Sequence, residues 1–144
     1  MGAVAGGNAA RLSGVSALDD RRPQVLLVED DHEVSALTRE LLASLGFSVS
    51  HVASPEAALR MLAQPHDFDI VLSDLVTPGG VTGLQLARQI RSLQPALRIL
   101  LTTGSVESFS GMKDEEFPLL LKPYTIQSLT RALEIALGAG VAPT

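Results

Sequence analysis

The chain has 144 residues, of which 46% are hydrophobic, and this is enough for one domain with its own hydrophobic core. The formal net charge of −5 gives no basic surface for nucleic acid or anionic lipid, and no apolar run approaches the roughly 20 residues that a membrane span needs. Cysteine is absent, which excludes disulfides and thiol chemistry and suits a reducing cytosol, so we expect a cytoplasmic protein without direct membrane contact.

Composition divides the chain into a central folded part and two tails. Residues 1–22 are rich in Gly, Ala, Ser and Arg without periodicity, which predicts a flexible linker or tail. Residues 23–138 are predicted to form the domain, and 139–144 a short C-terminal tail.

Short apolar runs alternate along residues 23–138 with stretches of helical periodicity. The predicted strands are 25–28, 47–52, 69–74, 98–104 and 118–122. The predicted helices are 32–45, 54–64, 83–93 and 125–137. A further helix is expected within 105–117, but Gly111 and a poor apolar stripe predict that it is short or irregular. Strands that alternate with helices predict an α/β fold with a doubly wound parallel sheet.

The apolar patterns also predict what each element buries. Four strands are apolar throughout, as strands covered on both faces must be, whereas 47–52 alternates and is the expected edge strand. Ser54 and Pro55 predict a helix start, Asp31 favours another, and Gly46 predicts a helix end. The helical side chains predicted to face the core are Val34, Leu37, Leu41, Leu45, Leu86, Ile90, Leu93, Ile126, Leu129, Leu133 and Ala136.

Polar residues follow four of the five predicted strands. Glu29 and Asp30 follow the first, Asp74 ends the third, Thr103 lies at the end of the fourth, and Lys122 ends the fifth. In an open parallel sheet, ligands bind outside the carboxyl ends of the strands. We therefore expect these five side chains to share one site.

This set of side chains suits a phosphoryl group and a metal ion. Clustered carboxylates repel one another and resist ionisation, and Mg²⁺ removes that repulsion with the oxygen ligands it prefers. The ammonium of Lys122 and the hydroxyl of Thr103 would then bind an incoming anion. A carboxylate nucleophile with charge neutralisation around it is what phosphoryl transfer requires.

Four motifs carry a resemblance to a known family. "VLLVEDD", "VLSDLVTPGG", "LLTTG" and "LLKPY", in this order and spacing, resemble the receiver domain of two-component response regulators, and the "PGG" form resembles receivers attached to hybrid histidine kinases. The resemblance covers residues 24–138. It implies a flavodoxin-like fold: a five-stranded parallel sheet with strand order 2-1-3-4-5 and helices on both faces.

The resemblance also implies roles for the site residues. Asp74 would be the phosphoacceptor, taking phosphoryl from a phosphohistidine of a histidine kinase or histidine phosphotransfer domain. Thr103 and Lys122 would bind the phosphoryl oxygens, and Lys122–Pro123 would be a cis bond. Mg²⁺ would be bound by Asp30, Asp74 and the backbone carbonyl of Val76, with Glu29 acting through water.

Two other functions remain open at this point. An aspartate-nucleophile phosphatase of the haloacid dehalogenase type would want a second acid two residues after Asp74, and that residue is Val76. A receiver-like interaction module that is never phosphorylated is the other alternative, although no residue of the site is missing. We expect no substrate turnover, no nucleic-acid partner and at most a weak homodimer.

Overall fold

The computed structural model describes residues 22–75, 82–104 and 116–138, and within them the chain forms one parallel sheet covered by helices. The strands are β1 (Gln24–Val28), β2 (Ser48–Val52), β3 (Ile70–Asp74), β4 (Arg98–Thr103) and β5 (Leu119–Leu121). The helices are α2 (His32–Ser44), α3 (Pro55–Leu62), α4 (Gly83–Leu93) and α5 (Ile126–Leu137). The strand order β2-β1-β3-β4-β5 confirms the predicted flavodoxin-like sheet, with 48–52 at an edge.

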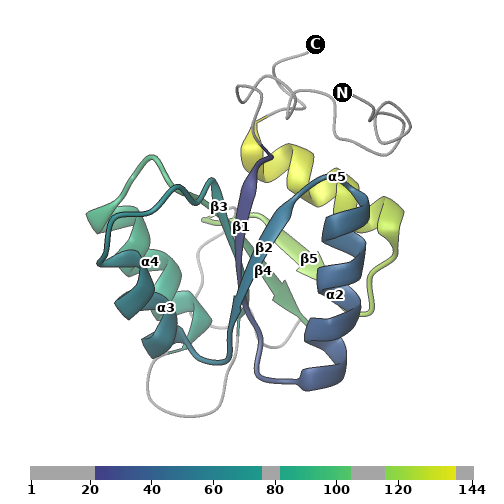
Figure 1. The fold of residues 1–144 in the computed structure, drawn as a ribbon, viewed down its shortest axis with the longest axis horizontal. Helices are drawn as coiled ribbons and strands as arrows, with labels where there is room; N and C mark the ends of the chain where they lie inside the picture. The colour runs from purple at the N-terminus through teal and green to yellow at the C-terminus, as the bar shows by residue number, and fades with distance from the viewer. Residues whose placement is uncertain (1–21, 76–81, 105–115, 139–144) are drawn as a thin grey trace.

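The sheet separates two hydrophobic cores, one under each helical layer. Helices α2 and α5 cover one face, and α3 and α4 cover the other (Figure 1). Successive residues of a strand point to opposite faces, so Val25 and Leu27 join the first core while Leu26 and Val28 join the second. The continuous apolar run of β1 is therefore explained by burial on both sides.

Local signals in the sequence set several helix ends as predicted. Asp31 is the N-cap of α2 and accepts a hydrogen bond from the Val34 amide, and Ser54 caps α3 with Pro55 at the first helical position. Gly46 has a φ of 98°, the left-handed conformation that favours glycine after a helix.

The predicted inward stripe of α2 is wrong at Leu37, which is 54% exposed. The side chains that the helix buries are Ser35, Thr38 and Leu42. Both polar residues face the core because their hydroxyls have partners: Ser35 donates to a backbone carbonyl, and Thr38 shares a hydrogen bond with the phenol of Tyr124. Because the sequence pattern considers apolar residues alone, it places the buried face of α2 about one residue away from its real position.

Three further burial predictions are wrong, each at the margin of an element. Leu93, the last residue of α4, is 71% exposed, and Ile126, the first of α5, is 36% exposed. Leu121 is 51% exposed because β5 is the second edge of the sheet, so this strand is not covered on both faces.

Some predictions fall on residues outside the described ranges. These are the two tails except Arg22, and the helix expected within 105–117 except for residues 116 and 117, which are not helical. Among the described residues, no helix is both long and apolar enough to cross a membrane.

The corrected face of α2 predicts a contrast between two leucines. Leu42→Ala should lower the free energy of unfolding by about 2–5 kcal/mol, because Leu42 is fully buried and its removal leaves a cavity. Leu37→Ala, on the exposed side, should change it by less than about 0.5 kcal/mol. Urea unfolding measures both, and equal losses would contradict the assignment.

Candidate functional site

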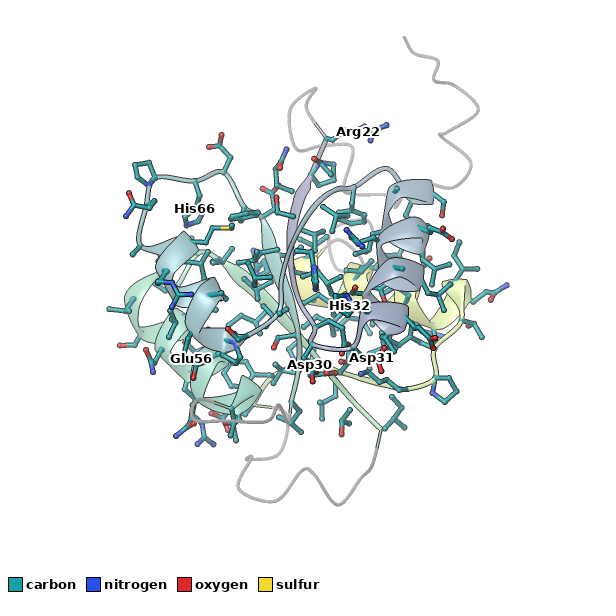
Figure 2. All side chains as sticks on the ribbon, turned by 60° about the horizontal axis from the view of Figure 1, so that its bottom comes forward. Arg22, Asp30, Asp31, His32, Glu56 and His66 are labelled. Carbon is teal, nitrogen blue, oxygen red and sulfur yellow. The ribbon has the colours of Figure 1, made fainter. Side chains whose placement is uncertain are left out.

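The polar strand ends meet at one edge of the sheet, as the sequence predicts. Glu29 directly follows β1, Asp74 and Thr103 are the last residues of β3 and β4, and Lys122 directly follows β5. Figure 2 shows Asp30 at this end of the molecule, beside the start of α2 and opposite the end that carries Arg22 and His66.

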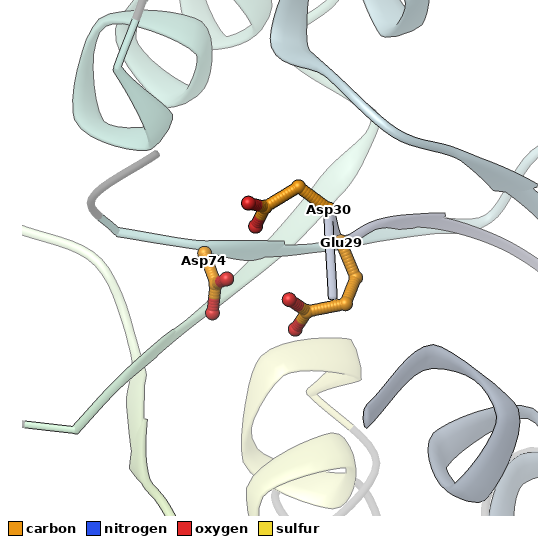
Figure 3. Close-up of side chains that lie close together, drawn as sticks. All are labelled: Glu29, Asp30 and Asp74. Carbon is orange, nitrogen blue, oxygen red and sulfur yellow. The ribbon is translucent and has the colours of Figure 1, made fainter. Parts of the chain in front are cut away.

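Three carboxylates form the centre of the site. Oxygen atoms of Glu29, Asp30 and Asp74 all lie within 4.8 Å of one another (Figure 3). Glu29 and Asp74 are 3% and 7% exposed, whereas Asp30 is exposed to solvent. The arrangement therefore has two buried acids and one acid that is exposed to solvent.

Lys122 lies between the two buried acids. Its Nζ is 2.6 Å from Asp74 Oδ1 and 3.1 Å from Glu29 Oε1. Burial lowers the pKa of Lys122, but the hydrogen bonds and charges of Asp74 and Glu29 more than offset this, so its pKa lies above the ordinary value. Lys122 therefore carries a positive charge at neutral pH.

The backbone around Glu29 is held from several sides. Its amide donates to the Val52 carbonyl at 3.1 Å, and its side-chain Oε2 accepts from the Asp31 amide at 3.1 Å. His51 Nε2 lies 2.7 Å from the Glu29 carbonyl oxygen, which can only accept, so Nε2 carries the proton. The sequence pattern does not indicate a role for His51. Its contact with Glu29 becomes apparent once β2 is known to lie beside β1.

The two threonines at the end of β4 have different contacts. Thr103, the predicted phosphoryl ligand, is 4% exposed, and its carbonyl accepts from the Lys122 amide at 2.8 Å. The hydroxyl of Thr102 donates to Asp74 Oδ1 at 2.8 Å. Sequence reasoning missed Thr102, although the parallel register pairs it directly with Asp74.

Gly83, the first residue of α4, fixes the backbone of the site. A Cβ at this position would lie 1.7 Å from the carbonyl oxygen of Asp74 and 2.9 Å from that of Leu75. Only glycine therefore lets α4 begin this close to the end of β3. The sequence showed Gly83 as a helix start but gave no sign of this contact.

Of the two remaining predictions about the site, the structure confirms one and does not describe the residue of the other. The Lys122–Pro123 bond is cis, as expected. Val76, whose carbonyl was predicted to bind metal, lies outside the described residues.

Comparison with known proteins identifies the family. Residues 25–134 match the family described as the response regulator receiver domain. The chain belongs to this family. It is 35% identical over 120 residues to the C4-dicarboxylate transport transcriptional regulatory protein DctD of Rhizobium meliloti, covering 78% of this chain and 25% of that protein.

Two more relatives have nearly the same extent as this receiver domain. The response regulator receiver protein CpdR of Brucella abortus is 29% identical over 115 residues, covering 77% of this chain and 93% of that protein. The crystal structure of a response regulator receiver protein from Sinorhizobium medicae has a TM-score of 0.74 at 26% identity, covering 82% of this chain and 96% of that one. The chain is thus a receiver domain of two-component systems, a class of signalling module that is generally non-catalytic.

The acidic centre of this receiver domain fits a hard divalent cation. Three carboxylates and one ammonium leave an excess of negative charge when all four groups are ionised. The pKa of Glu29 is raised to about 7, first by burial and then by the charge of Asp74, against the opposing hydrogen bonds from the Asp31 amide and Lys122. Closely spaced carboxylate oxygens under such repulsion are ligands of the kind that Mg²⁺ and Ca²⁺ take.

The raised pKa of Glu29 predicts a pH dependence of stability without metal. Between about pH 4.5 and 7, the folded protein holds a proton that the unfolded chain has released, so the free energy of unfolding falls as pH rises through this range. Glu29→Gln should remove this contribution, which is at most about 3 kcal/mol.

Urea unfolding in EDTA at several pH values measures the effect. The difference in unfolding free energy between Glu29→Gln and the unmutated protein should grow in favour of the variant as pH rises from 4.5 to 7. A difference that stays constant over this range would contradict the raised pKa.

Proposed function

We propose that this receiver domain accepts a phosphoryl group on Asp74 from the phosphohistidine of a histidine kinase or phosphotransfer domain. The observation that carries the proposal is a nearly buried carboxylate at the end of a central strand, with the Lys122 ammonium 2.6 Å away and two further acids beside it. The membership of the receiver family supports the same role.

The proposed transfer forms one bond and breaks one. An oxygen of the Asp74 carboxylate attacks phosphorus while the phosphorus–nitrogen bond of the donor breaks, and its electron pair stays on the imidazole, which takes up a proton. Lys122 would neutralise charge on the phosphoryl oxygens, and the Thr103 hydroxyl would donate a hydrogen bond to one of them. The product is an aspartyl phosphate on this chain, so we infer no turnover of a separate substrate.

We also propose that the site holds Mg²⁺. The ligands would be Asp30, Asp74 and the backbone carbonyl of Val76, with Glu29 acting through water. When bound, Mg²⁺ would supply neutralisation of the negative charge that gathers on the phosphoryl oxygens. The close spacing of Glu29, Asp30 and Asp74 supports this assignment.

The remaining features of the proposal concern partners and location. The sensor kinase CckA of Brucella abortus is 31% identical to this chain over 114 residues, which supports a kinase-linked partner. The absence of cysteine from all 144 residues fits a cytoplasmic location.

Asp74→Asn should abolish phosphorylation, because the amide is not a nucleophile. Intact-mass measurement after incubation with acetyl phosphate and Mg²⁺ should show a phosphorylated species for the unmutated protein and none for the variant. Asp31→Asn is the matched control and should label normally, since Asn is also a good N-cap for α2. An unmutated protein that stays unlabelled with every donor would favour the non-phosphorylated interaction module.

Asp30→Ala should weaken Mg²⁺ binding and phosphorylation together. We expect at least a roughly tenfold loss of Mg²⁺ affinity, because one of few carboxylate ligands is removed. The Mg²⁺ dependence of the labelling rate measures this, with Asp67→Ala, an exposed acid outside the cluster, as the control. Labelling of Asp30→Ala in EDTA at the unmutated rate would refute the metal role.

A further inference from the structure

We infer that Thr102 is a positioning residue that holds the Asp74 carboxylate in the orientation required for phosphoryl transfer. The inference rests on the proposed role of Asp74 as phosphoacceptor. It assigns a function to the hydroxyl next to Thr103 in sequence, which donates to Asp74 Oδ1 at 2.8 Å.

The sheet itself places this hydroxyl. Thr102 and Asp74 are register partners on the parallel strands β4 and β3, so both side chains leave the sheet on the same side. The backbone is locked at the same point, because the Leu75 amide donates to the Thr102 carbonyl at 2.7 Å. Thr102 is 3% exposed, and its side chain has a single stiff torsion to the hydroxyl.

Lys122 contacts the same oxygen, but it is a different kind of donor. Its ammonium sits on a long flexible stem, its side chain is 24% exposed, and it is shared between Asp74 and Glu29. In the proposed transfer, it also serves the incoming phosphoryl group. Thr102 therefore keeps its hydrogen bond to Asp74, whereas Lys122 is shared among Asp74, Glu29 and the incoming phosphoryl group.

Both donors reach Oδ1, and this distinguishes the two oxygens of Asp74. An oxygen that accepts a hydroxyl and an ammonium has less electron density to offer to phosphorus. We therefore expect the other carboxylate oxygen, Oδ2, to attack. Loss of the Thr102 hydroxyl would let the carboxylate rotate about its side-chain torsion, and misplacement of a reacting group by about 1 Å can slow a reaction roughly a hundredfold.

A purely structural role for Thr102 predicts something different. A buried hydroxyl needs a hydrogen-bond partner, and Asp74 would then serve only to satisfy it. In that case, removal of the hydroxyl changes the stability of the fold but not the rate at which the folded protein takes up phosphoryl. The rate of labelling, measured on protein shown to be folded, separates the two roles.

The test compares initial labelling rates over a range of acetyl phosphate concentrations at saturating Mg²⁺. Thr102→Val keeps the branched shape and removes the hydroxyl, and we expect its maximal rate to fall roughly ten- to a hundredfold with little change in the half-saturating donor concentration. Thr102→Ala, which demands less space, provides a second variant with the same expectation. Thr102→Ser keeps the hydroxyl and should recover most of the rate.

Ser73→Ala is the matched control. The Ser73 hydroxyl is buried and adjacent, but it donates to the backbone carbonyl of Asp74 rather than to its carboxylate, so its loss should leave the rate near that of the unmutated protein. Circular dichroism and urea unfolding confirm that each compared variant is folded.

Two results would overturn the inference while leaving the role of Asp74 intact: folded Thr102→Val or Thr102→Ala that labels at the unmutated maximal rate, or Thr102→Ser that is as slow as either of them. Two other results would refute the proposed function itself, and this inference with it. These are an unmutated protein that takes no label, or an Asp74→Asn variant that labels fully.

Discussion

The ion pair between Asp74 and Lys122 links the order of the strands to the assembly of the site. Asp74 is 7% exposed, and a carboxylate at that depth is unfavourable unless it is paired and hydrogen-bonded. The ammonium that pairs with it at 2.6 Å follows β5, which is separated from β3 by β4. The pair therefore joins the ends of two strands that are not neighbours, and the strand order that builds the two hydrophobic cores also brings these charges together.

Backbone contacts give this pair its rigidity. The end of β3 is bonded to β4 through the Leu75 amide on one side, and α4 begins against it at Gly83, where no side chain fits. Asp74 thus projects from a segment held by a neighbouring strand and a helix start. Reactive groups carried on rigid elements keep their geometry better than groups on loops, because their own rotamers are limited by packing.

The sequence predicts those parts of the molecule that depend on local pattern. Continuous apolar runs mark β1 and β3 because each is covered on both faces, and Asp31 and Ser54 mark helix starts because capping is a contact within four residues. The convergence of Glu29, Asp30, Asp74 and Lys122 also follows from the sequence, since the carboxyl ends of parallel strands meet at one edge. The strand order itself came from the family resemblance rather than from periodicity.

What the sequence does not predict depends on contacts between distant segments. The sequence pattern identifies Thr102 only as a strand residue, and the strand register is needed to pair it with Asp74. The pattern likewise identifies His51 only as part of an alternating edge strand, and its contact with Glu29 depends on β2 lying beside β1. The apolar pattern of α2 predicts Leu37 in the core because hydrophobicity alone cannot show that Thr38 has a buried partner in Tyr124. In each case, the missing information is a hydrogen bond across the fold.

The same charges that suit the site for phosphoryl chemistry oppose the stability of the fold. Burial and the proximity of Asp74 hold the pKa of Glu29 near 7, so ionisation of Glu29 at neutral pH lowers the stability of the folded state. One ammonium serves both buried acids, and it does not balance three carboxylates. Any ligand that binds the folded site and relieves this repulsion stabilises the fold in proportion to its binding, so the electrostatic strain in the free domain favours occupation by a cation.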